Sequence, residues 1–446
     1  MKGFHHMRTP CQRCATSIWR DGRCAQSDFV AGQASGIKTL QDIDRSVSIG
    51  QGGGSRLSKA INIDDLRLKA RSRLPKIFFD YIDGGAFSET TAARNRRDFS
   101  GYELMQRVLK VAEMPDLSTT YLGSTKPLPI MLGPVGFLGL YRGHGEIQTA
   151  RAAKVKNVPM CLSTFSIGSI GRLRTAVGGD LQFQLYMDRD KSFVEKLLQS
   201  AIDAEIDVLY LTVDTSITSV REKDVRNGFR AVTRLTAPLL LSMMQRPAWC
   251  IDMLRAGTPS VEAVDAYSEF GKGALEQASK LSARLDSSLT WSDVAWLRDN
   301  WKGRLVVKGI LSLEDAIIAK EKGADAIVIS NHGGRQLDYA ISTINALPAI
   351  RTAVGPDYDV LIDGGFRRGT DIAIALALGA SGVLLGRAYA FGLAAFGQTG
   401  VERVIAILEN ELRITLKLMG VASVEELRTH GHDYVRERQP GLSSLA

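Results

Sequence analysis

The chain has 446 residues, of which 45% are hydrophobic and 23% are charged, a composition typical of a globular protein rather than a disordered one. A net charge of +8 is compatible with acidic small molecules, anionic lipid or nucleic acid as binding partners. Aromatic residues make up only 7% and are not interleaved with basic residues, so the composition argues against nucleic acid.

The five cysteines are an odd number, which argues against a disulfide framework and favours a reducing, cytoplasmic compartment. Cys11, Cys14 and Cys24 lie together near the start, and only His5 or His6 could complete a set of four ligands. We expect no metal site, because no core-forming pattern surrounds these residues. The chain has no run of eighteen apolar residues and no apolar signal segment, so we expect neither a membrane-spanning helix nor secretion.

Two regions differ in their pattern. Residues 1–58 mix Arg, Ser, Gly and Gln without helical or strand periodicity, and we expect a disordered N-terminal extension. Residues 59–446 form the predicted folded domain, which opens with a helical segment. Asn62, followed by two aspartates and then apolar residues at helical spacing, suits a helix N-terminus.

Short apolar runs recur after residue 128, and each is followed by a stretch with a helical pattern. These eight runs are residues 129–134, 159–164, 181–186, 207–214, 304–309, 326–334, 359–365 and 382–387. Near-continuous apolar strands alternating with helices indicate a parallel sheet covered by helices, and eight repeats favour a closed (β/α)8 barrel. An open doubly wound sheet is the alternative, but the first run lacks a convincing G-x-G-x-x-G turn and its acidic partner.

A long insertion, residues 215–304, follows the fourth strand. Between Val225 and Ile251 it contains several arginines and no acid, together with apolar residues that include Leu239–Leu241, Met243, Met244 and Trp249. This composition is typical of a segment that lies on a membrane surface. A lid over the barrel or a contact between subunits would also explain it.

The carboxyl ends of barrel strands meet on one face, so residues that follow the strands are expected to be neighbours. The polar residues at these ends include Ser163, Gln184, Tyr186, Thr212, Asp214, Lys308, Ser330, His332 and Arg335. The last two strands end in DGGFRRGTD and LLGRAYA, which place glycines and the arginines Arg367 and Arg387 just before helices. Glycine-rich turns at helix N-termini with added positive charge predict a phosphate site.

Three strand-end residues suggest acid–base chemistry. His332 is the natural general base, and Asp214 could orient its ring. Lys308 could stabilise negative charge on a cofactor or form a Schiff base. Arg335 and Arg221 near one base imply a substrate carboxylate, because a guanidinium matches a carboxylate with two hydrogen bonds.

The motif SNHGGRQLD, with VKG before it and DGGFRRGTD after it, resembles the FMN-dependent L-2-hydroxy-acid oxidases and dehydrogenases. The string GPVGFLGL is similar to the branch that holds the bacterial lactate and mandelate dehydrogenases. The resemblance begins near residue 61 and implies bound FMN and oxidation of an L-2-hydroxy acid, of the L-lactate or (S)-mandelate type, to the 2-keto acid. It also implies a homo-oligomer, a tetramer by family likeness.

The resemblance implies a role for individual residues at the substrate. Tyr81 and Arg335 would bind the substrate carboxylate with help from Arg221, and Tyr186 would bind the hydroxyl or keto oxygen. His332, with Asp214 behind it, would accept a proton during oxidation. Whether the α-hydrogen leaves as hydride or as a proton is open.

The resemblance also implies the FMN contacts. Lys308 would lie beside N1 and the C2 carbonyl of the flavin. The residues implied for the ring and ribityl chain are Pro134, Val135, Gly136, Ser163, Gln184, Thr212 and Ser330. Those implied for ribityl and phosphate are Asp363, Gly364, Gly365, Phe366, Arg367, Gly386 and Arg387.

The sequence departs from the family pattern at several positions that bear on substrate and electron acceptor. Phe165 stands where plant glycolate oxidase has tryptophan, and we expect Phe165, Met131 and the insertion to shape the side-chain pocket. Gly136 stands where oxidases tend to carry alanine, a hint against oxygen as acceptor. The expected electron acceptor is membrane quinone, reached through residues 225–255, and oxygen is the alternative acceptor. Two alternative functions also stay open: an isomerase or aldolase that uses FMN or a substrate phosphate, and a non-catalytic FMN-binding protein.

Overall fold

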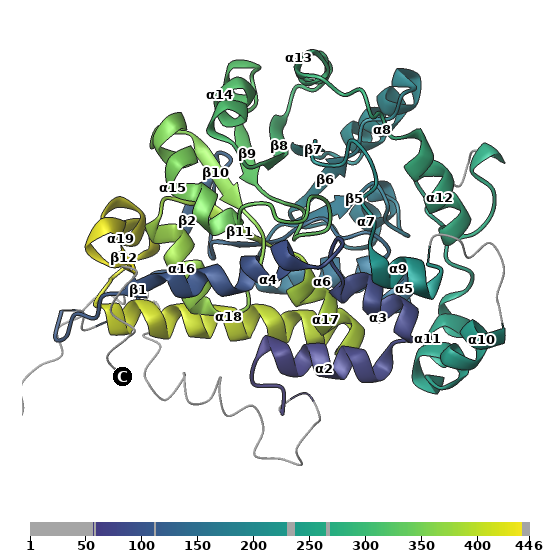
Figure 1. The fold of residues 1–446 in the computed structure, drawn as a ribbon, viewed down its shortest axis with the longest axis horizontal. Helices are drawn as coiled ribbons and strands as arrows, with labels where there is room; N and C mark the ends of the chain where they lie inside the picture. Colours follow the sequence, from purple (N-terminus) through teal and green to yellow (C-terminus); the bar gives the residue numbers. More distant parts are fainter. Residues whose placement is uncertain (1–56, 58, 111–112, 230–236, 265–267, 439–446) are drawn as a thin grey trace, which may run out of the picture. The chain divides into compact units, whose positions relative to one another are not determined.

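Eight parallel strands close into a barrel in the computed structural model, in the order β10-β11-β4-β5-β6-β7-β8-β9 (Figure 1). The structure describes residues 57, 59–110, 113–229, 237–264 and 268–438, with the side chains of residues 237–240 left out. The barrel strands are β4 (Ile130–Leu132), β5 (Met160–Ser163), β6 (Leu181–Leu185), β7 (Val208–Thr212), β8 (Arg304–Ile310), β9 (Ala326–Ile329), β10 (Asp359–Ile362) and β11 (Gly382–Leu385). Seven of these strands lie within a predicted apolar run, and β8 begins at the same residue as its run and extends beyond it. The (β/α)8 prediction is confirmed.

The strands carry little polar alternation because both of their faces are buried. One face packs against the surrounding helices, and the other fills the barrel interior with residues such as Met131, Cys161, Tyr210 and Val328. The Tyr210 hydroxyl donates to Gln182 Oε1 at 2.8 Å, which satisfies a polar atom in this interior. The expectation that Met131 shapes the substrate pocket is wrong, because its side chain belongs to this buried interior.

Strand β8 does not end at Lys308, as its sequence suggested, but runs on to Ile310. Its pairing with β9 shifts register between Lys308 and Ile310, and Gly309 between them has a φ of 114°. Such an irregularity re-aims the neighbouring side chain. A Cβ at position 309 would lie 2.7 Å from the Asp214 side chain, so glycine is required there.

Helices follow the strands as predicted, with one difference at the start of the domain. The helical segment after Asn62 is two helices, because Pro75 interrupts it. Asn62 and Asp65 form a capping box at its beginning. The helices outside the insertion are α2 (Ile63–Arg73), α3 (Lys76–Asp83), α4 (Thr90–Arg97), α5 (Leu138–Tyr141), α6 (Gly145–Lys156), α7 (Ile170–Ala176), α8 (Lys191–Asp203), α14 (Leu313–Glu321), α15 (Thr343–Val354), α16 (Gly369–Ala377), α17 (Arg387–Phe396), α18 (Gln398–Met419) and α19 (Val424–Thr429).

Small elements complete the domain outside the barrel. The short strands β1 (Tyr102–Leu104) and β12 (Val435–Glu437) pair with each other, as do β2 (Thr119–Tyr121) and β3 (Ser124–Lys126). The 3-10 helices are η1 (Asp98–Gly101), η2 (Ser268–Phe270) and η3 (Gly431–Asp433). Helix α17 packs against α18 and α2 along the lower edge of Figure 1. The cysteines and histidines of the N-terminal extension lie outside the described residues.

The insertion after β7 forms five α-helices in its described part, in addition to η2: α9 (Glu222–Asn227), α10 (Ala237–Met244), α11 (Pro247–Ala256), α12 (Ala274–Arg284) and α13 (Trp291–Asn300). Helices α10 and α11 lie together at the right-hand end of Figure 1. The sequence left Trp249 either on a membrane-facing surface or in a packed lid or subunit contact, and in the structure it does not lie on an exposed face. It is buried, its ring centroid lies 5.2 Å from that of Phe78, and its indole N–H donates to the Leu140 carbonyl at 2.9 Å. Trp249 therefore anchors the insertion to the barrel.

None of the described helices is both long enough and apolar enough to cross a membrane.

Candidate active site

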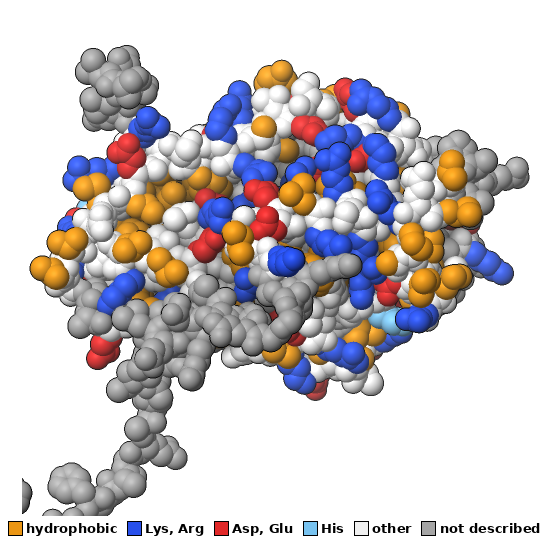
Figure 2. Space-filling view, turned by 90° about the horizontal axis from the view of Figure 1, so that it is seen from below, with side chains coloured by type: hydrophobic (Ala, Val, Ile, Leu, Met, Phe, Trp, Pro, Cys, Tyr) orange, Lys and Arg blue, Asp and Glu red, His pale blue; other side chains and the backbone are white. Residues whose placement is uncertain are grey.

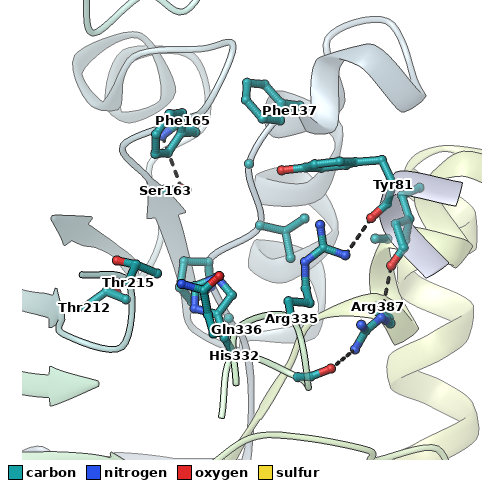
Figure 3. A pocket seen from close by; sticks show the side chains of 18 of the residues that line it. Tyr81, Phe137, Ser163, Phe165, Thr212, Thr215, His332, Arg335, Gln336 and Arg387 are labelled. Atoms are coloured by element: carbon teal, nitrogen blue, oxygen red, sulfur yellow. Dashed lines mark hydrogen bonds between the residues drawn. The ribbon is translucent and has the colours of Figure 1, made fainter. Parts of the chain in front are cut away.

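A cavity of about 440 Å³ opens at the carboxyl ends of the barrel strands (Figure 3). Among the residues that the sequence predicted for the site, those that line it are Tyr81, Pro134, Val135, Gly136, Ser163, Tyr186, Thr212, Arg221, Lys308, His332, Arg335, Asp363, Gly364, Gly365, Phe366, Arg367, Gly386 and Arg387. Asp214, Gln184 and Ser330 are absent from the lining and lie behind residues that form it: Asp214 bonds to His332, Gln184 to Ser163, and Ser330 to Lys308.

The histidine at the end of β9 is oriented by the aspartate that follows β7. Nδ1 of His332 lies 2.9 Å from Oδ1 of Asp214, which leaves Nε2 as the ring nitrogen able to accept a proton. Burial opposes ionisation of Asp214, but the charges of His332 and Lys308 outweigh it and hold the Asp214 pKa below its ordinary value. An ionised Asp214 stabilises the cation that His332 becomes on protonation.

A second buried network surrounds the lysine at the bulge of β8. Lys308 Nζ donates to Ser330 Oγ at 2.7 Å and lies 2.8 Å from Asp363 Oδ2. Burial lowers the Lys308 pKa, but the carboxylates of Asp363 and Asp214 outweigh it, so the net shift is upward. The ion pair with Asp363 therefore favours the charged form of Lys308 in the cavity wall over the neutral amine that a Schiff base requires.

Two arginines flank the ring of Tyr81. The guanidinium carbon of Arg335 lies 4.7 Å from the centre of the ring and that of Arg221 lies 5.5 Å from it. Figure 3 shows Arg335 directed toward Tyr81. Arg335 donates to the carbonyls of Tyr81 and Gly84, and no described carboxylate pairs with it. Burial and the charge of Arg221 lower the Arg335 pKa, so this end of the cavity favours an anion.

Arg367 and Arg387 form a second cationic end. Burial and neighbouring arginines lower the pKa of Arg387 to about 9, and burial with the charge of Arg96 lowers the pKa of Arg367 to about 10. Neither pairs with a carboxylate among the described residues, and both donate to backbone carbonyls instead. Two buried guanidiniums without counterions are costly unless an anion joins them.

The residues present fit FMN. Nε of Arg367, Oδ1 of Asp363 and Nε2 of Gln184 are buried and have no hydrogen-bond partner among the described residues, so a polar ligand would satisfy them. A Cβ at Gly386 would meet only Val135, at 3.9 Å, so the backbone before α17 is open to a close ligand. The arginines and the α17 N-terminus would hold the phosphate, and Gln184 and Lys308 would face the ring.

Several residues of the cavity were not predicted. The rings of Phe229 and Tyr81 stack with centroids 4.2 Å apart, and Phe137 adds further aromatic lining beside Phe165, which was expected at the pocket. Gln336 donates to the carbonyls of Asp214 and Ile217, which holds the loop after β7. The insertion was expected to shape the pocket without named residues, and its helix α12 lines the cavity through Leu275, Ala278, Ser279, Ser282 and Ala283. The adjacency of Gln336 to Arg335 was a usable signal, whereas the position of α12 depends on tertiary folding.

The lining of this cavity suits a flavin nucleotide beside a small carboxylic acid. The fold and the cavity together therefore indicate the class of flavin enzymes built on a (β/α)8 barrel. A profile of the FMN-dependent dehydrogenases matches residues 70–433. An L-lactate dehydrogenase of Caulobacter vibrioides is 44% identical over 365 residues, which cover 81% of this chain and 95% of that protein.

Solved structures give the same result. The structure of a monotopic membrane protein, (S)-mandelate dehydrogenase, matches with a TM-score of 0.81 at 37% identity over 85% of this chain and 100% of the other. A mandelate oxidase matches with a TM-score of 0.69 at 33% identity over 82% of this chain and 97% of the other. The chain belongs to the FMN-dependent dehydrogenase family. Its cofactor is FMN, and its reaction is the oxidation of a 2-hydroxy acid.

Proposed function

We propose that the enzyme oxidises an L-2-hydroxy acid of the L-lactate or (S)-mandelate type to the 2-keto acid and passes the electrons to a membrane quinone. The observation that carries this proposal is that one cavity holds His332, paired with Asp214, together with Arg335, which lacks a described carboxylate partner. A base beside an unpaired guanidinium suits a substrate that carries both a hydroxyl and a carboxylate.

The substrate carboxylate binds Arg335, with Arg221 and the hydroxyl of Tyr81 on the same side. The guanidinium of Arg335 is held by two backbone carbonyls, so its remaining N–H groups are fixed before the substrate arrives. Phe165 and Tyr186, whose ring centroids are 5.3 Å apart, adjoin the substrate side chain, and Tyr186 donates to the hydroxyl or keto oxygen. Burial raises the pKa of Tyr186, so its hydroxyl stays protonated and can donate.

FMN supplies the acceptor for two electrons when it is bound. His332 accepts a proton from the substrate at Nε2, and Asp214 stabilises the resulting imidazolium. The fixed charge of Lys308 favours negative charge at the ring-binding end of the cavity. Asp363 and Ser330 hold Lys308 in this position.

The other predicted residues bind the cofactor in this proposal. The residues that adjoin the ring and ribityl chain are Pro134, Val135, Gly136, Ser163, Gln184, Thr212 and Ser330. Those that bind ribityl and phosphate are Asp363, Gly364, Gly365, Phe366, Arg367, Gly386 and Arg387. Gly136 is closely packed, since a Cβ there would lie 3.0 Å from that of Phe165.

The membrane is reached through α10 and α11, which we call the docking patch. Its exposed hydrophobic side chains are Leu241, Met244, Ile251 and Leu254. Figure 2 shows hydrophobic side chains gathered at the right-hand end, where Figure 1 places these helices. Asp252 is paired with Arg73 of α2 and with Arg142 after α5, so this acid does not oppose an anionic lipid surface. The monotopic (S)-mandelate dehydrogenase supports this assignment by similarity.

The proposal assigns different roles to different parts of the insertion. Helix α12 lines the cavity, while none of the described side chains of the docking patch does. Part of the basic stretch, residues 230–236, lies outside the described residues. We place the enzyme at the inner face of the cytoplasmic membrane, as a homo-oligomer and a tetramer by family likeness.

The test compares substrates and acceptors with the purified FMN enzyme. We expect turnover with L-lactate or (S)-mandelate and a quinone analogue or redox dye, at least tenfold slower turnover with the D enantiomer, and slow turnover with oxygen. Fast turnover with oxygen and none with the quinone analogue would contradict the proposed acceptor. Equal rates for the two enantiomers would contradict the substrate assignment.

A further inference from the structure

Two buried asparagine side chains bind each other across a distance of 236 positions in the sequence. Asn95 Nδ2 donates to Asn331 Oδ1 at 2.7 Å, and Asn331 Nδ2 donates to Asn95 Oδ1 at 2.8 Å. Asn331 also accepts from the Gly334 backbone N–H at 3.0 Å and donates to the Ile341 carbonyl at 3.1 Å. Asn95 is 1% exposed and Asn331 is 5% exposed, so water does not compete for this pair.

Helix α4, which carries Asn95, is bonded to the same region along its length. Asp338 accepts from the backbone N–H groups of Ser88 and Thr91 at the start of the helix. Thr91 Oγ1 donates to the Leu337 carbonyl and accepts from the Ala340 N–H. Asn95 is the residue of α4 whose side chain hydrogen-bonds to residues 331–335, here called the base loop because it carries His332 and Arg335, while Ala92 packs against Gly334.

The base loop has a backbone that needs external support. His332, Gly333 and Gly334 all have positive φ values, of 56°, 66° and 73°. A histidine in this left-handed region is strained, and such a conformation persists only where the surrounding structure fixes it. The hydrogen bonds of Asn331 on one side and that of Ser330 Oγ with the His332 N–H on the other fix this turn.

Asn95 also contacts the loop at the phosphate end, residues 363–367, here called the phosphate loop. A Cβ at Gly365 would lie 1.8 Å from the Asn95 carbonyl oxygen, so glycine lets the two backbones touch. Asn95 Oδ1 accepts from the Thr343 N–H at 3.4 Å, and Thr343 Oγ1 donates to the Asp363 carbonyl at 2.6 Å. The side chain and the backbone of one residue therefore hold both loops.

We propose that Asn95 is a positioning residue that fixes the base loop and the phosphate loop relative to each other. The inference rests on the proposed roles of His332 and Arg335, and Asn95 acts through these residues without touching the substrate. Its loss lets the base loop relax from the strained turn, which moves the base and the carboxylate-binding guanidinium together. Displacements of about 1 Å at reacting groups reduce rates by as much as a hundredfold.

The experiment compares Asn95→Ala, Asn331→Ala and the double variant as FMN enzymes. We expect each single variant to lower kcat by at least tenfold and to raise KM, because the general base His332 and the carboxylate-binding Arg335 share the base loop. The kcat of the double variant should be no lower than that of the less active single variant, since either substitution alone breaks the hydrogen bonds between the two asparagines. Binding of FMN to the Asn95→Ala apoprotein, followed by flavin fluorescence, should weaken on the order of tenfold, whereas Asn331→Ala should change it less.

The matched control is Thr149→Ala. Thr149 is fully buried and its hydroxyl donates to the Gly145 carbonyl within α6, away from both loops. It should lower the Tm while leaving kcat, KM and FMN affinity within twofold of wild type. If Asn95→Ala and Asn331→Ala behave like this control, or if their effects on kcat multiply in the double variant, the inference is overturned.

Asn95→Asp serves if the alanine variant does not fold. It keeps the side-chain volume and the acceptor toward Asn331 Nδ2 but loses the donor toward Asn331 Oδ1. A folded Asn95→Asp enzyme with wild-type kcat, KM and FMN affinity would overturn the inference. A wild-type protein that oxidises no 2-hydroxy acid would contradict the proposed function instead, and the FMN affinities would still test the role of Asn95 at the phosphate loop.

Discussion

Nδ1 of His332 and Oδ1 of Asp214 lie 2.9 Å apart although the two residues are 118 positions apart in the sequence. They meet because β7 and β9 flank β8 in the barrel, and the loops after both strands reach the same cavity. The bulge at Gly309 leaves room for Asp214 between them, since any side chain at position 309 would collide with this aspartate. The orientation of the base therefore depends on all three strands.

Replacement of His332 should abolish proton acceptance while leaving the cofactor site intact. For His332→Gln we expect kcat to fall about 10²–10⁴-fold, the range that general-base catalysis contributes. The flavin spectrum and FMN content should match the wild type. A loss of less than tenfold in a stopped-flow measurement of flavin reduction would show that another group accepts the proton.

Replacement of Arg335 by lysine keeps the charge and removes the planar fork that binds a carboxylate with two hydrogen bonds. We expect KM for the hydroxy acid to rise at least tenfold in steady-state kinetics, because binding of the carboxylate is weakened. The control is Arg226→Lys, an exposed arginine paired with Glu222 on α9, which should change neither constant. An unchanged KM for Arg335→Lys would place the carboxylate elsewhere.

The ionised state of Asp214 should make stability depend on pH in a defined direction. Its folded-state pKa is depressed, so ionised Asp214 stabilises the fold above the unfolded pKa, which is about 3.9. This contribution is lost as the pH falls below that value and through the folded pKa. In thermal melts, the Tm of the Asp214→Asn variant should therefore lie below the wild-type Tm at pH 7, and the two Tm values should converge near pH 3. A constant difference in Tm over this range would be inconsistent with the depressed pKa.

Charge placed on the docking patch should separate membrane binding from catalysis. Leu254 is 82% exposed on α11, and the Ile251→Glu, Leu254→Glu variant should lose most of its sedimentation with anionic lipid vesicles. Turnover with a soluble dye should remain, because neither residue lines the cavity. Val155→Glu, an exposed position on α6, is the control and should still sediment. Full vesicle binding by the double variant would move the membrane contact away from α11.

The sequence was sufficient for the barrel because each strand is an apolar run buried on both faces, bounded by polar or glycine residues. The division of the first helical segment into α2 and α3 was missed although Pro75 signals it, whereas the continuation of β8 past Lys308 through a bulge could not be predicted. The sequence also left the position of Trp249 open. The composition of residues 225–251 suits a membrane surface and a packed lid equally well, and for Trp249 the packing against Phe78 decides between them.

The strand-end rule brought His332, Lys308 and Arg335 to one cavity, because it depends only on the parallel arrangement of the strands. No comparable rule predicts which residues from outside the barrel reach the cavity. Phe229 comes from the insertion and stacks on Tyr81, and Asn95 comes from a helix before the first barrel strand and packs against Gly365. Contacts of this kind depend on tertiary packing and leave no periodic pattern in the sequence.

The most direct test of the central assignment is anaerobic reduction of the bound flavin. The visible spectrum of the purified FMN protein should bleach rapidly on addition of L-lactate or (S)-mandelate, and not with the D enantiomer of the same acid. This result would establish cofactor, reaction and stereochemistry together. A flavin spectrum that neither acid bleaches, in protein saturated with FMN, would contradict the proposed substrate class, and a protein that binds no FMN would contradict the account of the cavity.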